Sequence, residues 1–232
     1  MSDFMTFMAA PAAGCVVLAV IFTYFGLHVL RREIIFVDLS LAQLAALGTT
    51  LGFAMEWPSG SVSVQALSLL FVLLGALFFS AVQYSFPKVL PEAVIGIVYV
   101  VGASLSIIIA DRSPHAAEHI QHMLNGSILW ITWQGVGTLA LTTVLVGALI
   151  WKWRKPLHEL SERTTESPVS FNRALWNFVF YTALGVVIAM SVKTAGIFLV
   201  FTLLIIPAVC GTLFTDGFAR QFSLGACIGV LG

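Results

Sequence analysis

The stretch TAGIFLVFTLLIIPAVCGTLFT, residues 194–215, contains no Asp, Glu, Lys or Arg. It is long enough to cross a bilayer, because a helix needs about 20 apolar residues to span the hydrocarbon core. Backbone polar groups cannot be left unpaired in lipid, so such a run is predicted to be helical. A further span, at about 35–55, carries one acid, Asp38, near its start. Other charge-free runs occupy residues 11–30, 57–87, 93–110, 123–151, 174–192 and 221–232.

The composition of the whole chain agrees with a protein embedded in lipid. Hydrophobic residues make up 59% of the sequence and charged residues 9%, and the mean hydropathy is +1.00. These are too few polar side chains to cover a surface that faces water. The runs show no alternation of apolar and polar residues, which excludes membrane strands. The sequence therefore predicts an all-α integral membrane protein, a polytopic helical bundle of about seven to eight spans.

Basic residues give the chain an orientation in the membrane. When the runs are threaded back and forth, only Arg112 and Lys193 fall on one side. Loops rich in Lys and Arg stay in the cytoplasm, so the N-terminus is expected outside. Residues 152–173 are then expected inside and residues 111–134 outside. The basic residues on the cytoplasmic side are Arg31, Arg32, Lys88, Lys152, Arg154, Lys155, Arg163, Arg173 and Arg220.

The C-terminal end of the sequence does not complete a span. The residues that follow Arg220, QFSLGACIGVLG, are too few to recross the bilayer. We therefore expect a single transmembrane domain over residues 1–232, truncated at its C-terminus by a final span or pair of spans.

A proline near the cytoplasmic end of the 194–215 run predicts a functional element. Pro207 removes a backbone hydrogen bond, so residues 208–218 are expected to leave the span and form a short helix along the cytoplasmic membrane face. A protruding helix of this kind could contact an ATPase and be displaced when the ATPase changes conformation. The alternative is a proline-kinked span with no partner, which is at least as common. The residues assigned to coupling are Pro207, Gly211, Thr215, Asp216 and Gly217.

Four segments carry a resemblance to a known family. They are VVIAMSVKTAGIFLVFTLLIIPAVCGTLF, RREIIFVDLSLAQLAALGTTLG, EAVIGIVYVVGASLSIII and EHIQHMLNGSILWIT. Over most of residues 25–220 the chain resembles the ATP-binding-cassette (ABC) metal permeases of the zinc and manganese importer family. It is also similar to the vitamin B12 and siderophore permeases, which have a comparable glycine, apolar and proline stretch before their coupling loop.

This resemblance implies a permease subunit of an importer for zinc, manganese or iron in the bacterial inner (plasma) membrane. A siderophore or vitamin B12 permease is the alternative. The implied partners are a second permease copy that completes a homodimeric channel, a cytoplasmic ATPase dimer and a metal-binding protein outside. The divalent ion is cargo, and no permanently bound cofactor is implied. No Walker A loop, GxxxxGK followed by Ser or Thr, occurs in the chain, so ATP hydrolysis is expected in a separate subunit.

The second span departs from the pattern of this family. Many of its members have an Asp and a His four residues apart, as in GDALSHAALPG, where this chain has Leu39 and Gln43. Asp38 is one position away and so lies on a different helix face. An acid inside a span is costly and generally faces a cavity, so Asp38 is a candidate ligand on the metal path.

The outer segment supplies a second group of candidate metal ligands. His115, Glu118, His119 and His122 are spaced i, i+3, i+4 and i+7, which places them on one helical face. Imidazole and carboxylate suit Zn, Mn or Fe(II), so this group could receive an ion from a binding protein. The alternative is a polar helix face that simply meets water.

Part of the same group matches a catalytic motif. His115, Glu118 and His119 spell H-x-x-E-H, in which two His bind zinc and Glu activates a water molecule. An intramembrane or surface metallopeptidase is therefore a rival hypothesis. The motif stands in a short outer segment after Pro114 rather than on a long helix, which favours transport.

Overall fold

The computed structural model describes residues 2–58, 60–86, 88–111, 126, 128–153 and 171–231. Throughout these residues the regular structure is helical, as the sequence predicts. The helices are α1 (Ser2–Arg31), α2 (Val37–Ala54), α3 (Val62–Ser85), α4 (Pro91–Asp111), the short 3₁₀ helix η1 (Ile128–Trp130), α6 (Trp133–Lys152), α8 (Phe171–Ala195), α9 (Ile197–Phe214) and α10 (Phe218–Leu231).

Seven of the described helices are long and apolar enough to cross a membrane. They are α1 to α4, α6, α8 and α9, and they match the seven spans expected up to residue 215. At 14 residues, α10 is too short to span the core by itself. The prediction of a polytopic helical membrane protein is therefore confirmed.

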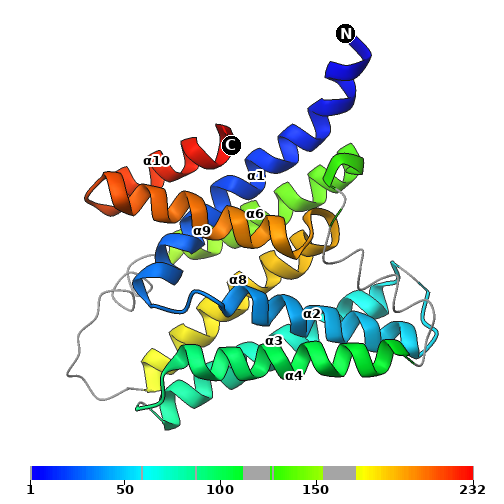
Figure 1. The fold of residues 1–232 in the computed structure, drawn as a ribbon, viewed down its shortest axis with the longest axis vertical. Coiled ribbons are helices and arrows are strands. Elements are labelled where there is room, and N and C mark those ends of the chain that lie inside the picture. Colours follow the sequence, from blue (N-terminus) through cyan, green and yellow to red (C-terminus); the bar gives the residue numbers. More distant parts are fainter. Residues whose placement is uncertain are drawn as a thin grey trace.

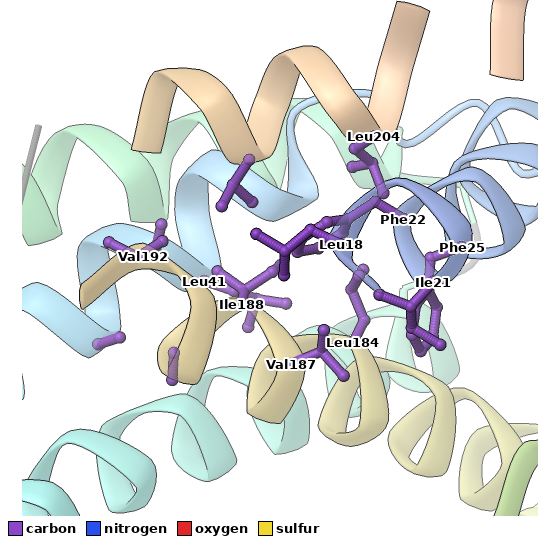
Figure 2. Close-up of a cluster of buried hydrophobic side chains, with 14 of the residues drawn as sticks. Leu18, Ile21, Phe22, Phe25, Leu41, Leu184, Val187, Ile188, Val192 and Leu204 are labelled. Atoms are coloured by element: carbon purple, nitrogen blue, oxygen red, sulfur yellow. The ribbon is translucent and has the colours of Figure 1, made fainter. Parts of the chain in front are cut away.

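The spans pack in two groups that share α8 (Figure 1). In one group α1 contacts α6, α9 and α10. In the other group α2 lies between α3 and α4, and α8 packs against α2 and α3 while also contacting α6 and α9. Figure 2 shows where the groups meet: Leu18 and Phe22 of α1, Leu41 of α2 and Ile188 of α8 form one buried cluster. The core thus sits on α1, α2, α8 and α9.

The helix ends divide the bundle into two sides (Figure 1). The end of α1, the α3–α4 link and the α9–α10 turn lie on the left. We call this the basic end because Arg31 ends α1, Lys88 lies in the α3–α4 link and Arg220 lies in the first turn of α10, just after the α9–α10 turn. The α2–α3 and α8–α9 links lie at the opposite end. The alternation of chain direction that the basic residues predict is therefore present in the fold.

Glycines allow close approach between helices of the first group. A β carbon at Gly26 of α1 would overlap the carbonyl oxygen of Leu204 on α9. A β carbon at Gly225 of α10 would lie 2.6 Å from the carbonyl oxygen of Pro207. In lipid, helices associate mainly through such packing, since the surrounding chains are as apolar as the helices. The small residues of α1, α9 and α10 therefore hold these helices together.

One expectation about this region is wrong. Pro207 lies inside α9, which continues as a helix to Phe214, so the chain does not leave the span at the proline. Residues 208–214 are the last turns of α9, and the break comes at residues 215–217 instead. A proline is tolerated in a membrane helix because neighbouring helices and local adjustments satisfy the freed backbone groups.

Candidate functional site

Asp38 lies in the first turn of α2, the most enclosed span of the bundle. Its side chain is only 2% exposed. One carboxylate oxygen, Oδ1, is buried and accepts no hydrogen bond within the described part of the chain. A buried acid without full hydrogen bonding is costly and is retained mainly where it serves a function. The structure therefore leaves an oxygen ligand in the second span.

Gln43, on the same span, is 8% exposed and belongs to the helix that packs against α4. Gly102 of α4 faces it, and a β carbon there would be 3.5 Å from the β carbon of Gln43, an ordinary van der Waals contact. Leu39 is half-buried. The second span thus carries an amide and an alkyl side chain at positions 43 and 39, and the acid Asp38 lies next to Leu39.

Most other buried polar side chains of the spans already donate to backbone carbonyls. Ser68 Oγ donates to Ala45 O at 2.9 Å, and Ser40 Oγ donates to Ile95 O at 3.1 Å. Among the described residues, no group of three or more His, Cys, Asp or Glu side chains is placed to hold a metal ion. Asp38 is therefore a candidate ligand that belongs to no such group within the described residues.

The histidine group at the outer segment, His115, Glu118, His119 and His122, lies outside the described residues. The structure shows where that segment joins the bundle. Gly126, with φ +66, lies directly against the carbonyl of Ala195 at the α8–α9 link. Trp130 then packs edge-on against Phe7 of α1, with ring centroids 5.8 Å apart. The candidate ligands therefore belong to a segment that ends against α1 and the α8–α9 link.

The residues assigned to coupling fall into two environments. Pro207 and Gly211 are buried between α9 and α10, and a β carbon at Gly211 would overlap the backbone of Gln221. Asp216 and Gly217, by contrast, are exposed in the α9–α10 turn at the basic end. Pro207 and Gly211 thus serve helix packing, and the exposed surface that a partner could contact is the turn.

The α9–α10 turn is held by side chains. Gln221 Nε2 donates to the carbonyl of Thr215 at 3.1 Å, and Thr215 Oγ1 donates to the carbonyl of Gly211 at 3.0 Å. Gln221 also accepts a 3.0 Å hydrogen bond from Arg31 Nη2 at the end of α1. The turn is therefore fixed both to α9 and to α1.

A polar network that the sequence analysis did not single out lies nearby. Arg32 Nη1 donates to Asn177 Oδ1 at 3.2 Å, and Asn177 Nδ2 donates to Gln83 Oε1 at 2.9 Å. Gln83 Nε2 donates to the Tyr181 hydroxyl at 2.6 Å. Burial lowers the pKa of Arg32 to about 10, which leaves the guanidinium charged at neutral pH. The network joins the end of α1 to α3 and α8.

A signal for this network was present in the sequence. Gln83 and Asn177 are amides inside otherwise apolar runs, and polar groups in such runs tend to pair across helices. Their partner, Arg32, was counted only as a charge that orients the chain. Spacing along one helix cannot reveal the pairing, because Gln83 and Asn177 lie 94 positions apart.

The arrangement defines a class: a polytopic helical membrane protein with a buried acid in a central span and an exposed turn at its basic end. The sequence matches the family described as the ABC 3 transport family over residues 4–232. The chain belongs to this family, and it is a membrane-spanning permease subunit of an ABC transporter. No curated protein matches the sequence.

Two solved structures share the fold. PsaBC from Streptococcus pneumoniae, solved in complex with a Fab, superposes with a TM-score of 0.77 at 17% identity over 99% of this chain and 82% of that chain. A transporter described as of the metal-chelate ABC type, in an inward-facing conformation, superposes with a TM-score of 0.67 at 14% identity. That alignment covers 96% of this chain and 72% of the other. At these identities the likeness concerns the fold.

Proposed function

We propose that the protein is the permease subunit of an ABC importer for a divalent transition metal ion, zinc, manganese or iron. The match to the ABC 3 transport family over residues 4–232 carries the proposal. The buried carboxylate of Asp38 supports it, since an acid inside a span is a usual feature of an ion pathway. Membership of this family favours transport over the peptidase chemistry of an H-x-x-E-H motif.

The path that we propose has two stages. The ion first meets Glu118 and His119, with His115 and His122 beside them, at the outer mouth. It then passes the carboxylate of Asp38 in the second span. Conduction needs sites that bind well enough to admit the ion and weakly enough to release it, and an isolated acid in the membrane fits this requirement.

A metal chelate is the second candidate cargo. Gln43 offers an amide at the place of the family's histidine, and an amide hydrogen-bonds an organic ligand more readily than it replaces imidazole on a metal. The similar fold of the metal-chelate type transporter agrees with this alternative. In such a case the chelator supplies most of the ligands, and Gln43 contacts the chelator.

The complete transporter would contain other subunits. We propose a second copy of this chain, a cytoplasmic ATPase dimer that docks at the α9–α10 turn and a metal-binding protein outside, in a bacterial inner membrane. Asp216, exposed in that turn, would face the ATPase. Cytoplasmic placement of this turn follows from the basic residues at the same end of the bundle.

Metal uptake tests the function directly. The permease would be expressed with its ATPase and binding protein in a bacterial strain that lacks its own importers, and radioactive zinc, manganese and iron would be offered with and without a chelator. ATP-dependent uptake of a free ion supports the first proposal. Uptake only of the chelated metal favours the second, and uptake of neither contradicts both.

A further inference from the structure

Two consecutive arginines at the end of α1 bind different helices. The Arg31 guanidinium donates to Gln221 of α10 at 3.0 Å and lies 4.9 Å from the ring centroid of Phe218. The Arg32 guanidinium donates to Asn177 of α8 at 3.2 Å and lies 3.8 Å from the ring centroid of Phe180. Both arginines thus combine a hydrogen bond with a cation–π contact, and they tie α1 to two helices.

On the side of Arg31 the contacts lead to the α9–α10 turn. Gln221 uses its amide oxygen for Arg31 and its amide nitrogen for the carbonyl of Thr215. An amide that both accepts and donates in this way links its two partners with a defined geometry. A displacement of the turn therefore moves the Arg31 side chain and the end of α1.

On the other side the contacts lead to α8 and α3. Asn177 accepts from Arg32 and donates to Gln83, which in turn donates to Tyr181. Ser80 of α3 additionally donates to the carbonyl of Ala174 on α8. The end of α1 is thus joined to a hydrogen-bonded pair of helices that belong to the second packing group.

The end of α1 is also joined closely to α2. The amide of Ile34 donates to Val29 O at 3.2 Å, and the amide of Val37 donates to Ile34 O at 3.2 Å. Ile34 itself is 1% exposed, so the link is anchored in the core. Because this short link leads into the first turn of α2, movement of the α1 end displaces the segment that carries Asp38.

We propose that Arg31 and Arg32 are positioning residues that transmit movement of the α9–α10 turn to α2 and α8 during ATP-driven transport. The inference rests on the turn being the ATPase docking site, and it does not depend on the identity of the cargo. Each arginine acts through one amide: Arg31 through Gln221 at the turn, and Arg32 through Asn177 in the second packing group. Chains of packed side chains and hydrogen bonds such as these can carry conformational coupling between distant parts of a protein.

The alternative role for these contacts is a static clasp. Removal of a static contact lowers the stability of the whole complex, and ATP hydrolysis falls together with helix movement. Removal of a transmitting contact leaves ATP hydrolysis in place and abolishes the movement of α2. The two roles therefore differ in the ratio of movement to hydrolysis, and this ratio is the quantity to measure.

The experiment uses the complete complex of permease and ATPase in lipid nanodiscs. Cys15, Cys210 and Cys227 are first replaced by Ala. Spin labels at Ser223→Cys on α10 and Glu56→Cys beyond the end of α2 then report the distance between the two elements with and without ATP. Gln221→Leu removes both contacts of the Gln221 amide, the one to Arg31 and the one to the carbonyl of Thr215. Gln65→Leu is the matched control, because Gln65 lies near the other end of α3 from Gln83 and donates to Met190 Sδ of α8.

The expected result is a Gln221→Leu complex that hydrolyses ATP but whose ATP-dependent distance change falls about fivefold or more, whereas Gln65→Leu behaves as the parent. The exchanged pair Arg31→Gln with Gln221→Arg restores the change, because the hydrogen bond is retained in reverse. Asn177→Leu gives the same loss from the other side.

Three outcomes would overturn the inference. One is a distance change in Gln221→Leu equal to that of the parent. Another is a parallel fall of hydrolysis and distance change, which is the behaviour of a static clasp. The third is failure of the exchanged pair to restore the movement. If transport of metal fails in the uptake assay while these distances change as expected, the cargo assignment is wrong and the transmission role stands.

Discussion

Gly26 of α1 packs directly on the carbonyl of Leu204 in α9, and the β carbon of any other residue at position 26 would overlap that oxygen. Neither helix can yield easily, because Leu204 is fully buried and both α1 and α9 also pack against α10. The contact places the backbone of α1 against the segment that contains Pro207. This explains why small residues gather in these helices.

Gly26→Val is therefore expected to destabilise the protein strongly. Overpacking a well-filled site costs about 1–3 kcal/mol, and overlap with backbone places this site at the upper end. The matched control is Gly137→Val, since a β carbon at Gly137 meets no atom within 4 Å. Thermal unfolding in detergent, followed by loss of monodisperse protein on gel filtration, measures both. Equal melting temperatures for the two variants would show that α1 and α9 can move apart at position 26 without loss of stability.

Asp38→Asn is expected to impair transport and leave the fold intact. The change keeps the size of the side chain and removes the charge that would bind a cation, so the metal concentration for half-maximal uptake should rise about tenfold or more. Glu56→Gln is the matched control, because it also removes one carboxylate charge, from an exposed position in the α2–α3 link beyond the other end of α2. An uptake curve for Asp38→Asn that coincides with those of the control variant and the parent would show that the ion does not bind Asp38 on its way.

Much of the fold could be predicted from the sequence, and the features that could not be predicted have a physical reason in common. Charge-free length predicts the spans, because lipid enforces helices, and α4 covers the run 93–110 as expected. The predicted end of the span at Pro207 was wrong: α9 continues through the proline to Phe214, and Gly225 of α10 packs closely on Pro207 there. Hydrogen bonds between helices, such as that of Arg32 with Asn177, could not be predicted from the sequence, because they depend on which helices become neighbours.

Asp216→Arg is expected to weaken association with the ATPase. Asp216 is exposed in the α9–α10 turn, so the reversed charge perturbs a partner surface without disturbing the packed helices. Ser223→Arg, on an exposed position of α10, is the control for added charge near the same end. Co-purification of the ATPase from membranes measures the effect. Retention of the ATPase by Asp216→Arg at the level of the control would exclude this turn from the docking surface.

The sidedness of the bundle can be tested with single cysteines. Lys88→Cys lies in the α3–α4 link at the basic end, and Glu56→Cys lies in the α2–α3 link at the opposite end; both positions are exposed. The excess of Lys and Arg predicts that the basic end is cytoplasmic. In intact cells an impermeant thiol reagent should therefore label Glu56→Cys and not Lys88→Cys, in a background with Cys15, Cys210 and Cys227 replaced. The reverse pattern would invert the topology.

Glu118→Ala with His119→Ala tests the outer stage of the metal path. Loss of a carboxylate and an imidazole weakens capture of the ion, so uptake should require a metal concentration about tenfold higher, while the maximal rate is kept because later steps are unchanged. His158→Ala is the matched control for loss of an imidazole elsewhere in the chain. Because Asp38 acts later on the same path, combining Asp38→Asn with the double change should abolish uptake. An uptake curve for the double variant that matches the control would identify the group as a solvated helix face, and the ion would then enter by another route.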